Sequence, residues 1–334
     1  MTNCAVIGLG NMGKHHARIY NETAASNLVA VADINPATGQ AIADRFGCRF
    51  YADYRTMIQN ESIDAVSIAV PTSKHEEVAT RCARNGLNVL LEKPIAADLT
   101  EAVNISESAR LHDVILQVGH IEHFNPAVIK LKEILNQEKL GDLLTIVVRR
   151  VGIAPPQIQD ANVIIDLAIH DIDLCNYLLD GLPDKVYCRA GNGILSDRED
   201  YADIFMEYRN VNVLIQSNWI TPVKIRQMHL TGTKGYADLD FIEQKLYLAE
   251  TIVEHDYDSF GSFVVKLGQS NRLEIPIEND EPLKLEIEHF LDCVRNRTTP
   301  QIDGKRATDA LRVALDAWQV SQNNSPDKPA VDTE

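Results

Sequence analysis

Two groups of residues in this sequence have the types and spacing that chemistry on a hydroxyl group requires. Lys93 comes just after the apolar run LNVLL and just before Pro94, which stiffens the turn. Asp166, His170 and Asp173 stand at positions i, i+4 and i+7 of an apolar segment, so a helix there places them on one face. The ammonium could stabilise the alkoxide that forms as a hydride leaves, and the imidazole could accept the hydroxyl proton. Asp166 could orient the imidazole or hold a neighbouring hydroxyl.

Other roles stay open for the same residues. Lys93 could be a surface lysine paired with Glu92, Asp166 could cap a helix, and His170 could be a buried structural histidine. Asp166 and His170 could also be two metal ligands, but two ligands do not make a site and no third stands nearby. We therefore expect no metal.

A glycine-rich turn near the amino terminus predicts a dinucleotide site. The strand-like run CAVI leads into a GLGNMG sequence that opens a helical pattern, with the candidate cofactor contacts Gly8, Gly10, Asn11, Met12 and Gly13. Gly8 allows the tight turn, Gly10 lets the backbone approach the pyrophosphate, and Gly13 allows close packing of helix on strand. The helix N-terminus then faces the phosphates.

Asp33 predicts which nicotinamide cofactor binds. It ends the second strand-like run, where a carboxylate accepts hydrogen bonds from the adenosine ribose and repels a 2′-phosphate. Ile34 and Asn35 follow it, so no arginine or lysine is at hand to bind that phosphate. We therefore expect NAD rather than NADP. The alternative role for Asp33 is to cap the helix that begins near Pro36.

Later strand ends should reach the same crevice, because the carboxyl ends of parallel strands meet at one edge of the sheet. Thr72 and His75 follow the run DAVSIAV, and Glu92 and Lys93 follow LNVLL. We expect all four to line the cofactor site. Thr72 could equally cap the next helix.

The elements that position these residues form two domains. Residues 1–120 alternate apolar strand-length runs with helical patterns, which predicts a Rossmann domain with a doubly wound parallel sheet. Residues 121–320 predict an α+β substrate-binding and oligomerisation domain with a mostly antiparallel sheet. Its expected helices and first strand are near Pro126–Leu135, Leu144–Val151, Ile165–Leu179, Pro282–Arg297 and Lys305–Gln322. The polar tail 321–334 is expected to be disordered.

Composition narrows the partners. At 334 residues the chain exceeds one typical core, and its net charge of -16 disfavours nucleic acid and anionic membranes. The six cysteines form no CxxC pair, and no signal peptide or bilayer-length apolar run is present, so we expect a cytoplasmic protein. A small molecule remains the expected ligand.

The GLGNMG turn, the Glu92-Lys93-Pro94 tripeptide and the Asp166-x-x-x-His170 segment, in this order, resemble the Gfo/Idh/MocA oxidoreductase family. The resemblance runs to about residue 320. It implies a Rossmann domain, an α/β domain whose sheet forms a homodimer or homotetramer interface, and Lys93, Asp166 and His170 as the catalytic group.

Within the family, residues 119–126, 224–226 and 232–235 resemble a subgroup that oxidises C3 of the nucleotide sugar UDP-N-acetylglucosamine. This resemblance implies substrate contacts from His120, Phe124, Asn125 and Arg226. Two positions depart from the pattern: His123 stands where the subgroup often has arginine, and Ala168 where the family often has glycine.

Three functions therefore stand side by side. The leading one is NAD-dependent oxidation of a nucleotide sugar, whose diphosphate could be held by basic residues of the second domain, namely Arg149, Arg150, Lys224 and Arg226. The second is oxidation of a free sugar or a polyol such as an inositol. The third is a non-catalytic protein that senses NAD, for which the joint presence of Lys93 and His170 would be unnecessary.

Overall fold

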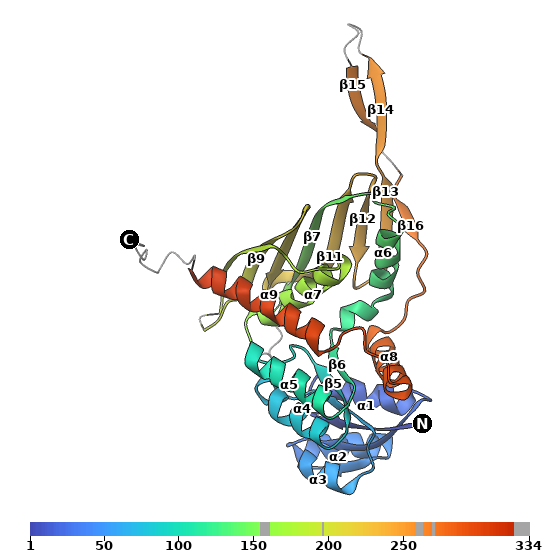
Figure 1. Ribbon diagram of the computed structural model, residues 1–334, viewed down its shortest axis with the longest axis vertical. Helices are drawn as coiled ribbons and strands as arrows, with labels where there is room; N and C mark the ends of the chain where they lie inside the picture. The colour runs from blue at the N-terminus through green and yellow to red at the C-terminus, as the bar shows by residue number, and fades with distance from the viewer. Residues whose placement is uncertain (154–160, 196, 258–262, 269–270, 324–334) are drawn as a thin grey trace. The chain divides into compact units, whose positions relative to one another are not determined.

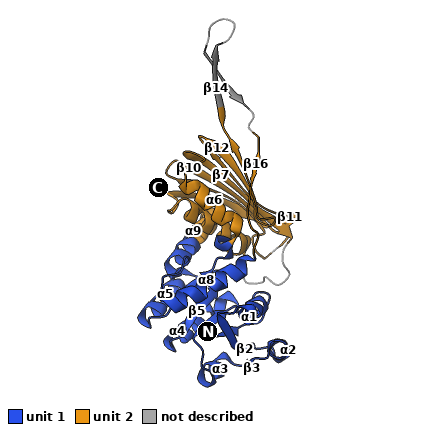
Figure 2. Ribbon diagram, turned by 90° about the vertical axis from the view of Figure 1, so that its right-hand side faces the viewer, with its two compact units in different colours: residues 1–124, 281–312 blue, residues 125–280, 313–334 orange. Residues whose placement is uncertain are grey.

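The computed structural model describes residues 1–153, 161–195, 197–257, 263–268 and 271–323. The chain divides into two compact units, residues 1–124 with 281–312 and residues 125–280 with 313–334 (Figure 2). None of the described helices is long and apolar enough to cross a membrane.

The first unit is built on a six-stranded parallel sheet in the order β3-β2-β1-β4-β5-β6. Its strands are β1 (Thr2–Ile7), β2 (Ser26–Ala32), β3 (Arg49–Tyr51), β4 (Ala65–Ile68), β5 (Asn88–Glu92) and β6 (Leu116–Gly119). The order reverses between β1 and β4, which is where doubly wound sheets bind their ligands. The predicted Rossmann fold is confirmed.

Helices connect these strands, and three of them begin at a residue whose side chain caps the helix. They are α1 (Gly13–Glu22), α2 (Pro36–Phe46), α3 (Tyr54–Asn60), the 3-10 turn η1 (Thr72–Lys74), α4 (His75–Arg84), α5 (Leu99–Leu111) and the 3-10 turn η2 (Ile121–Phe124). The side chain of Asn35 accepts from Ala37 and Thr38 at the start of α2. Gly47 ends α2 in the left-handed conformation, with φ of 69°. The short β3 and α3 were not predicted.

A late segment completes the first unit. Helix α8 (Pro282–Asn296) packs against α1, and Leu283, Ile287 and Phe290 join the hydrophobic core that contains Val6 and Tyr20. The expected boundary near residue 120 falls close to the end of the first segment at Phe124, but residues 281–312 return to this unit. The apolar face of α8 is what brings them back.

The second unit contains an eight-stranded sheet in the order β16-β13-β12-β11-β7-β10-β9-β8 (Figure 1). Its strands are β7 (Leu143–Ile153), β8 (Lys185–Gly191), β9 (Tyr201–Tyr208), β10 (Val211–Asn218), β11 (Ile220–Gly232), β12 (Gly235–Asp240), β13 (Lys245–Glu250) and β16 (Leu273–Ile275). β10 pairs with β7 in parallel, and the other neighbours are antiparallel. The predicted mostly antiparallel sheet is confirmed, and β14 (Ile252–Tyr257) and β15 (Phe263–Gly268) form a separate two-stranded ribbon.

The helices of the second unit are α6 (Pro126–Asn136), a π-helical turn η3 (Ile164–Ala168) and α7 (Ile169–Leu178). α6 packs on β12 and β13, while α7 and η3 pack on β10. Helix α9 (Gly304–Asn323) runs to residue 323, so the first three residues of the tail expected to be disordered are helical. Residues 324–334, the rest of that tail, lie outside the described residues.

The eight-stranded sheet has a covered face and an outer face. On β7, Ile146 and Val148 are fully buried, whereas Val147 between them is 39% exposed. Neighbouring strands place further apolar side chains in register with Val147, and we define the outer row as Val147, Leu214, Phe205 and Tyr187 on β7, β10, β9 and β8. Leu214 and Tyr187 are 42% and 47% exposed. A shallow groove of about 530 Å³ includes all four residues in its lining.

Candidate active site

The glycine-rich turn has the close contacts that its sequence predicts. Gly8 adopts φ of 86°, and a Cβ there would lie 2.5 Å from the Ala69 carbonyl oxygen. A Cβ on Gly13 would lie 1.8 Å from the Gly8 carbonyl oxygen, so only glycine lets α1 start this close to the strand. Gly10 is exposed, and a Cβ there would meet nothing within 4 Å. The open space over Gly10 is what a cofactor diphosphate needs.

Asp33 is fixed against this turn. Its carboxylate accepts hydrogen bonds from the backbone N–H of Leu9 at 2.6 Å and of Asn35 at 2.7 Å. The cap of α2 is Asn35, so the alternative role of Asp33 as that cap is wrong. Half-buried at the end of β2, Asp33 is held where an adenosine ribose would approach it.

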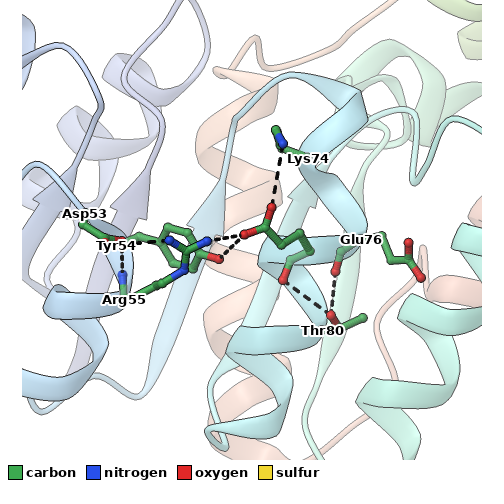
Figure 3. Close-up of polar contacts among 7 residues, drawn as sticks. Asp53, Tyr54, Arg55, Lys74, Glu76 and Thr80 are labelled. Atoms are coloured by element: carbon green, nitrogen blue, oxygen red, sulfur yellow. Dashed lines mark hydrogen bonds and ion pairs between the residues drawn. The ribbon is translucent and has the colours of Figure 1, made fainter.

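A cavity of about 660 Å³ adjoins Asp33 and includes Gly8, Gly10 and Pro71 in its wall. The cations in its lining are Arg55 and Lys74 (Figure 3), and both pair with the carboxylate of Glu77 in α4. The Arg55 guanidinium lies 2.6 Å from Glu77 Oε1, and Lys74 Nζ lies 3.8 Å from Oε2. Since both cations are paired with Glu77, the cavity favours the uncharged 2′-hydroxyl of NAD over a 2′-phosphate.

Glu92 is the last residue of β5, and its side chain belongs to a buried series of hydrogen-bonded side chains. Its Oε1 lies 2.9 Å from His16 Nε2, and His16 Nδ1 lies 2.9 Å from the hydroxyl of Ser67. Tyr20 contacts the same hydroxyl at 2.8 Å. Burial raises the pKa of Glu92, but the hydrogen bond that it accepts from His16 and the charge of Lys93 outweigh it and lower that pKa. Glu92 is therefore an anion directly before Lys93.

His75, at the start of α4, is 1% exposed. Its Nδ1 lies 2.9 Å from the Pro94 carbonyl oxygen, and its Nε2 lies 3.0 Å from that of Val70. Burial is the main reason why the pKa of His75 is lowered. The ring therefore lies between the ends of β4 and β5 and donates its one N–H to one of these two carbonyl oxygens. Thr72 is half-buried beside it, and neither η1 nor α4 has a side-chain cap bond.

Asp166 and His170 belong to one helical segment of the second unit. Asp166 lies in the π-helical turn and His170 in the first turn of α7, and both are half-buried. Asn162 accepts from the N–H groups of Ile164 and Ile165 and so caps this segment, which removes the alternative role of Asp166 as the cap. Single π-turns are frequent at functional sites. Asp173, which the spacing places on the same face, is buried, with 4% of its surface exposed.

The basic residues near this segment have different roles. The Arg150 guanidinium, 4% exposed, forms a buried pair with Asp171 of α7 at 2.7 to 2.9 Å and packs over the ring of Phe241. Arg149 projects to the outer face, where it donates to Gln216. Arg226 donates to the Val151 carbonyl oxygen at 3.0 Å. Of the four basic residues named from the sequence, Arg150 is thus committed to the fold.

The remaining candidates for substrate contact are buried. His120 is 1% exposed in the loop after β6, and the ring centroid of Phe124 lies 5.3 Å from that of His289 in α8. Asn125 caps α6 through Ala127 and donates to the Phe241 carbonyl oxygen at 3.0 Å. Phe124 and Asn125 therefore hold the ends of their own elements.

The first unit contains one buried acid that the sequence did not indicate. Glu286 of α8 is 0% exposed, and neither carboxyl oxygen has a hydrogen-bond partner. Burial, together with the charge of Glu92, raises its pKa well above the usual range. Glu286 is therefore a neutral carboxylic acid. Its position on the apolar face of α8 was the available signal.

The predicted site residues are divided between the two units. The first unit contains all the predicted cofactor contacts, together with Lys93, His120 and Phe124. The second unit contains Asn125, Asp166, His170 and Arg226. Lys93 is half-buried directly after β5. The sequence analysis missed His16, Ser67 and Tyr20. Among the described residues, no group of three or more His, Cys, Asp or Glu side chains could hold a metal ion.

Comparisons with known proteins match both parts of the chain. Residues 2–120 match the profile of the oxidoreductase family with an NAD-binding Rossmann fold, and residues 128–238 match the GFO/IDH/MocA C-terminal domain. UDP-N-acetylglucosamine 3-dehydrogenase of Acidithiobacillus ferrooxidans is 29% identical over 93% of this chain and 94% of its own. The scyllo-inositol 2-dehydrogenase (NAD(+)) of Bacillus subtilis is 26% identical over 97% of this chain and 95% of its own.

A solved structure supports the same grouping. That of the Acidithiobacillus UDP-N-acetylglucosamine 3-dehydrogenase aligns with a TM-score of 0.81 and 26% identity, covering 96% of this chain and 97% of the other.

Proposed function

The chain belongs to the Gfo/Idh/MocA oxidoreductase family and is an NAD-dependent dehydrogenase, and from this premise we propose that it oxidises C3 of UDP-N-acetylglucosamine to the 3-keto sugar. The observation that carries the proposal is the similarity to a UDP-N-acetylglucosamine 3-dehydrogenase over 93% of the chain. Direct oxidation of a sugar hydroxyl requires a cofactor cradle, a cation beside the alkoxide and a proton acceptor.

The first unit fits the cofactor. Gly8 and Gly13 hold a turn that no larger residue could form, and Asp33 faces the place of the adenosine ribose. When bound, NAD accepts the hydride that leaves the sugar carbon. In the proposal, Thr72, His75, Glu92 and Lys93 complete the cofactor site.

The proposed catalytic group is Lys93, Asp166 and His170. Lys93 donates a hydrogen bond to the reacting hydroxyl and stabilises its developing negative charge. His170 accepts the hydroxyl proton, either directly or from Lys93, and Asp166 orients its ring. His170→Asn should slow hydride transfer by about 100-fold with little change in NAD affinity. Single-turnover NADH formation measures this effect, and a rate near wild type would remove His170 from the mechanism.

Substrate binding is assigned to His120, Phe124, Asn125 and Arg226, with the diphosphate near Lys224 and Arg226 of β11. The buried pair with Asp171 makes Arg150 a poor candidate, and Arg149 faces outward. Binding energy from the diphosphate positions the sugar ring, so its loss should lower turnover as well as affinity.

A specific observation favours a second candidate, oxidation of a polyol: the Bacillus scyllo-inositol 2-dehydrogenase matches 97% of this chain. The purified protein with NAD is therefore assayed with UDP-N-acetylglucosamine, free N-acetylglucosamine and inositols, each up to saturation, while NADH absorbance is followed. The nucleotide sugar should have the highest kcat/KM. Equal efficiency with the free sugar, or preference for an inositol, would replace the first proposal with the second.

The non-catalytic NAD sensor is tested by Lys93→Ala. In this variant a dehydrogenase should lose turnover while it still binds NAD, whereas a sensor should keep its function.

We also propose that a second copy of the chain covers the outer face of the eight-stranded sheet, as a homodimer or homotetramer. Three of the four residues of the outer row are at least 39% exposed, and the rings of Tyr187 and Phe205 lie 5.9 Å apart. Contiguous exposed apolar side chains of this kind mark interaction surfaces.

A further inference from the structure

Two buried histidines anchor the residues on either side of Lys93. His16 of α1 binds the side chain of Glu92, and His75 of α4 binds the main chain of Pro94. We propose that His16 and His75 are positioning residues, which together fix the turn that carries Lys93 and so aim its ammonium group. This inference rests on the proposed role of Lys93 in catalysis.

The direction of each hydrogen bond in the His16 chain can be assigned. The carboxylate of Glu92 can only accept, so His16 Nε2 carries the hydrogen of that bond. In the neutral imidazole Nδ1 then accepts from the hydroxyl of Ser67, which in turn accepts from the hydroxyl of Tyr20. These three contacts fix the imidazole in one tautomer. Glu92 is therefore held by a donor that is itself held in place.

The His75 link has a different geometry. Carbonyl oxygens only accept hydrogen bonds, and the two ring nitrogens lie 2.9 Å from that of Pro94 and 3.0 Å from that of Val70. A neutral imidazole has one N–H, so it donates to one of these oxygens at a time and packs against the other. The ring thus lies between the turn after β5 and the turn after β4 and separates them by a fixed distance. The turn after β4 includes Pro71, which lines the cofactor cavity.

Together these links restrain Lys93 from both sides in sequence. The carboxylate of Glu92 is bound by His16 on one side, and the carbonyl of Pro94 contacts the buried His75 ring on the other, so both neighbours of Lys93 are restrained. A lysine side chain has four rotatable bonds, and its head is placed only as well as its backbone is placed. Because a misplacement of about 1 Å can cost on the order of 100-fold in rate, such restraint matters for catalysis.

The variants are His75→Leu and His16→Leu, each paired with a conservative change that keeps a donor, His75→Asn and His16→Gln. Each leucine variant should slow single-turnover NADH formation at saturating NAD by about 10- to 100-fold, and His16→Leu, which lies outside the proposed cofactor contacts, should change NAD affinity less than about threefold. The amide variants should recover part of the rate. Exposed His15, next to His16 on α1, supplies the control His15→Leu, which should behave as wild type.

A double-mutant cycle separates positioning from a general structural effect. In a Lys93→Ala background the histidine changes have no ammonium left to aim, so their effect on the residual rate should fall to less than about twofold. An equal loss with and without Lys93 would overturn the proposal. If a leucine variant does not fold, the cycle is run with the amide variant.

A readout that needs no substrate keeps this inference distinct from the proposed function. The acetylation rate of Lys93 in the NAD-free protein is measured by mass spectrometry, with exposed Lys14 as the internal reference. Loosening the turn should raise the Lys93 rate about threefold or more, since reactivity follows local order and exposure. An unchanged rate in both His16 and His75 variants would overturn the inference, even if the sugar proposal stands. A changed rate without sugar oxidation would support the restraint and reject the substrate.

Discussion

The two sheets of this protein differ in how many of their faces are covered by other elements. The strands of the six-stranded sheet are mostly apolar, and the four residues of β4 are all buried, as expected between two layers of helices. The eight-stranded sheet alternates, with Ile146 and Val148 buried and Val147 exposed between them. The first sheet therefore offers a ligand only its carboxyl edge, whereas the second offers a whole face.

The two units also differ in where their buried polar side chains lie. In the first unit His16, Ser67 and Glu92 form a chain at the strand ends, beside the residues proposed to bind cofactor. In the second unit Arg150 and Asp171 form one ion pair between β7 and α7. The edge of a parallel sheet brings several loops together, so polar side chains from distant segments can meet there.

The largest expected effect comes from damaging that edge. Gly13→Ala should destabilise the first unit by about 3 kcal/mol or more and abolish NAD binding, since its Cβ would collide with the Gly8 carbonyl. Gly10→Ala is the matched control, because its Cβ meets nothing: the melting temperature should hold while NAD affinity falls. Calorimetry and NAD titration measure both. Equal melting temperatures for the two variants would contradict the argument.

The second prediction tests whether the protein self-associates through the outer face of the eight-stranded sheet. Leu214→Glu places a charge in the middle of the outer row and should weaken self-association by about 30-fold or more, since burying an unpaired charge costs at least about 2 kcal/mol. Sedimentation over a range of concentrations reports the assembly. Asn212→Glu, two residues earlier on the same exposed side of β10, should have a smaller effect. A monomeric wild-type protein would refute the proposed assembly.

The third prediction concerns how the buried carboxyl group of Glu286 makes the stability of the protein depend on pH. Its folded pKa is raised, so its contribution to stability is fully present below the unfolded pKa near 4.5 and is lost as pH rises through the folded value. Glu286→Gln copies the neutral acid, so it should match wild type near pH 4 and exceed its unfolding free energy by about 1 to 3 kcal/mol at pH 8. Urea unfolding at both pH values measures this. A destabilised glutamine variant at pH 8 would show that the folded protein needs the anion.

The smallest effect is expected at the exposed rim of the cofactor cavity. Glu77→Gln removes the partner of Arg55 and Lys74 and should change stability by less than about 1 kcal/mol, since exposed ion pairs contribute little. The same change should lower the preference for NAD over NADP, because two cations near Asp33 lose their carboxylate. Affinities for both cofactors test this, and an unaltered ratio would mean that Asp33 alone discriminates.

Sequence reasoning succeeded where the determinants are local. The glycine turn was predictable because each glycine meets a steric demand set by its near neighbours, and the strands were predictable from apolar runs. The carboxylate of Asp33 was placed correctly at the end of its strand for the same reason. The short and mostly polar α3 was missed, since seven residues without an apolar stripe give no helical signal.

Where the determinants are distant in sequence, the same reasoning failed. Arg149 and Arg150 are adjacent, and alternation says that one of them faces inward without saying which. Only the structure, with Asp171 opposite Arg150, decides it. Likewise, Glu286 stands on the apolar face of α8, but only the packing of α8 on α1 shows that its carboxyl group is buried. The sequence around His75 gives no sign that its ring lies between two main-chain carbonyls.

The return of α8 also bears on how the protein can be made and recombined. During synthesis the nucleotide-binding half leaves the ribosome with a gap in its core, because Leu283, Ile287 and Phe290 are translated about 160 residues after Phe124. A gene fragment that stops at residue 124 would encode a protein with that apolar surface open to water. Exchange of cofactor-binding halves between relatives therefore requires three crossover points, one before α6, one before α8 and one after residue 312, if the transplanted half is to fold.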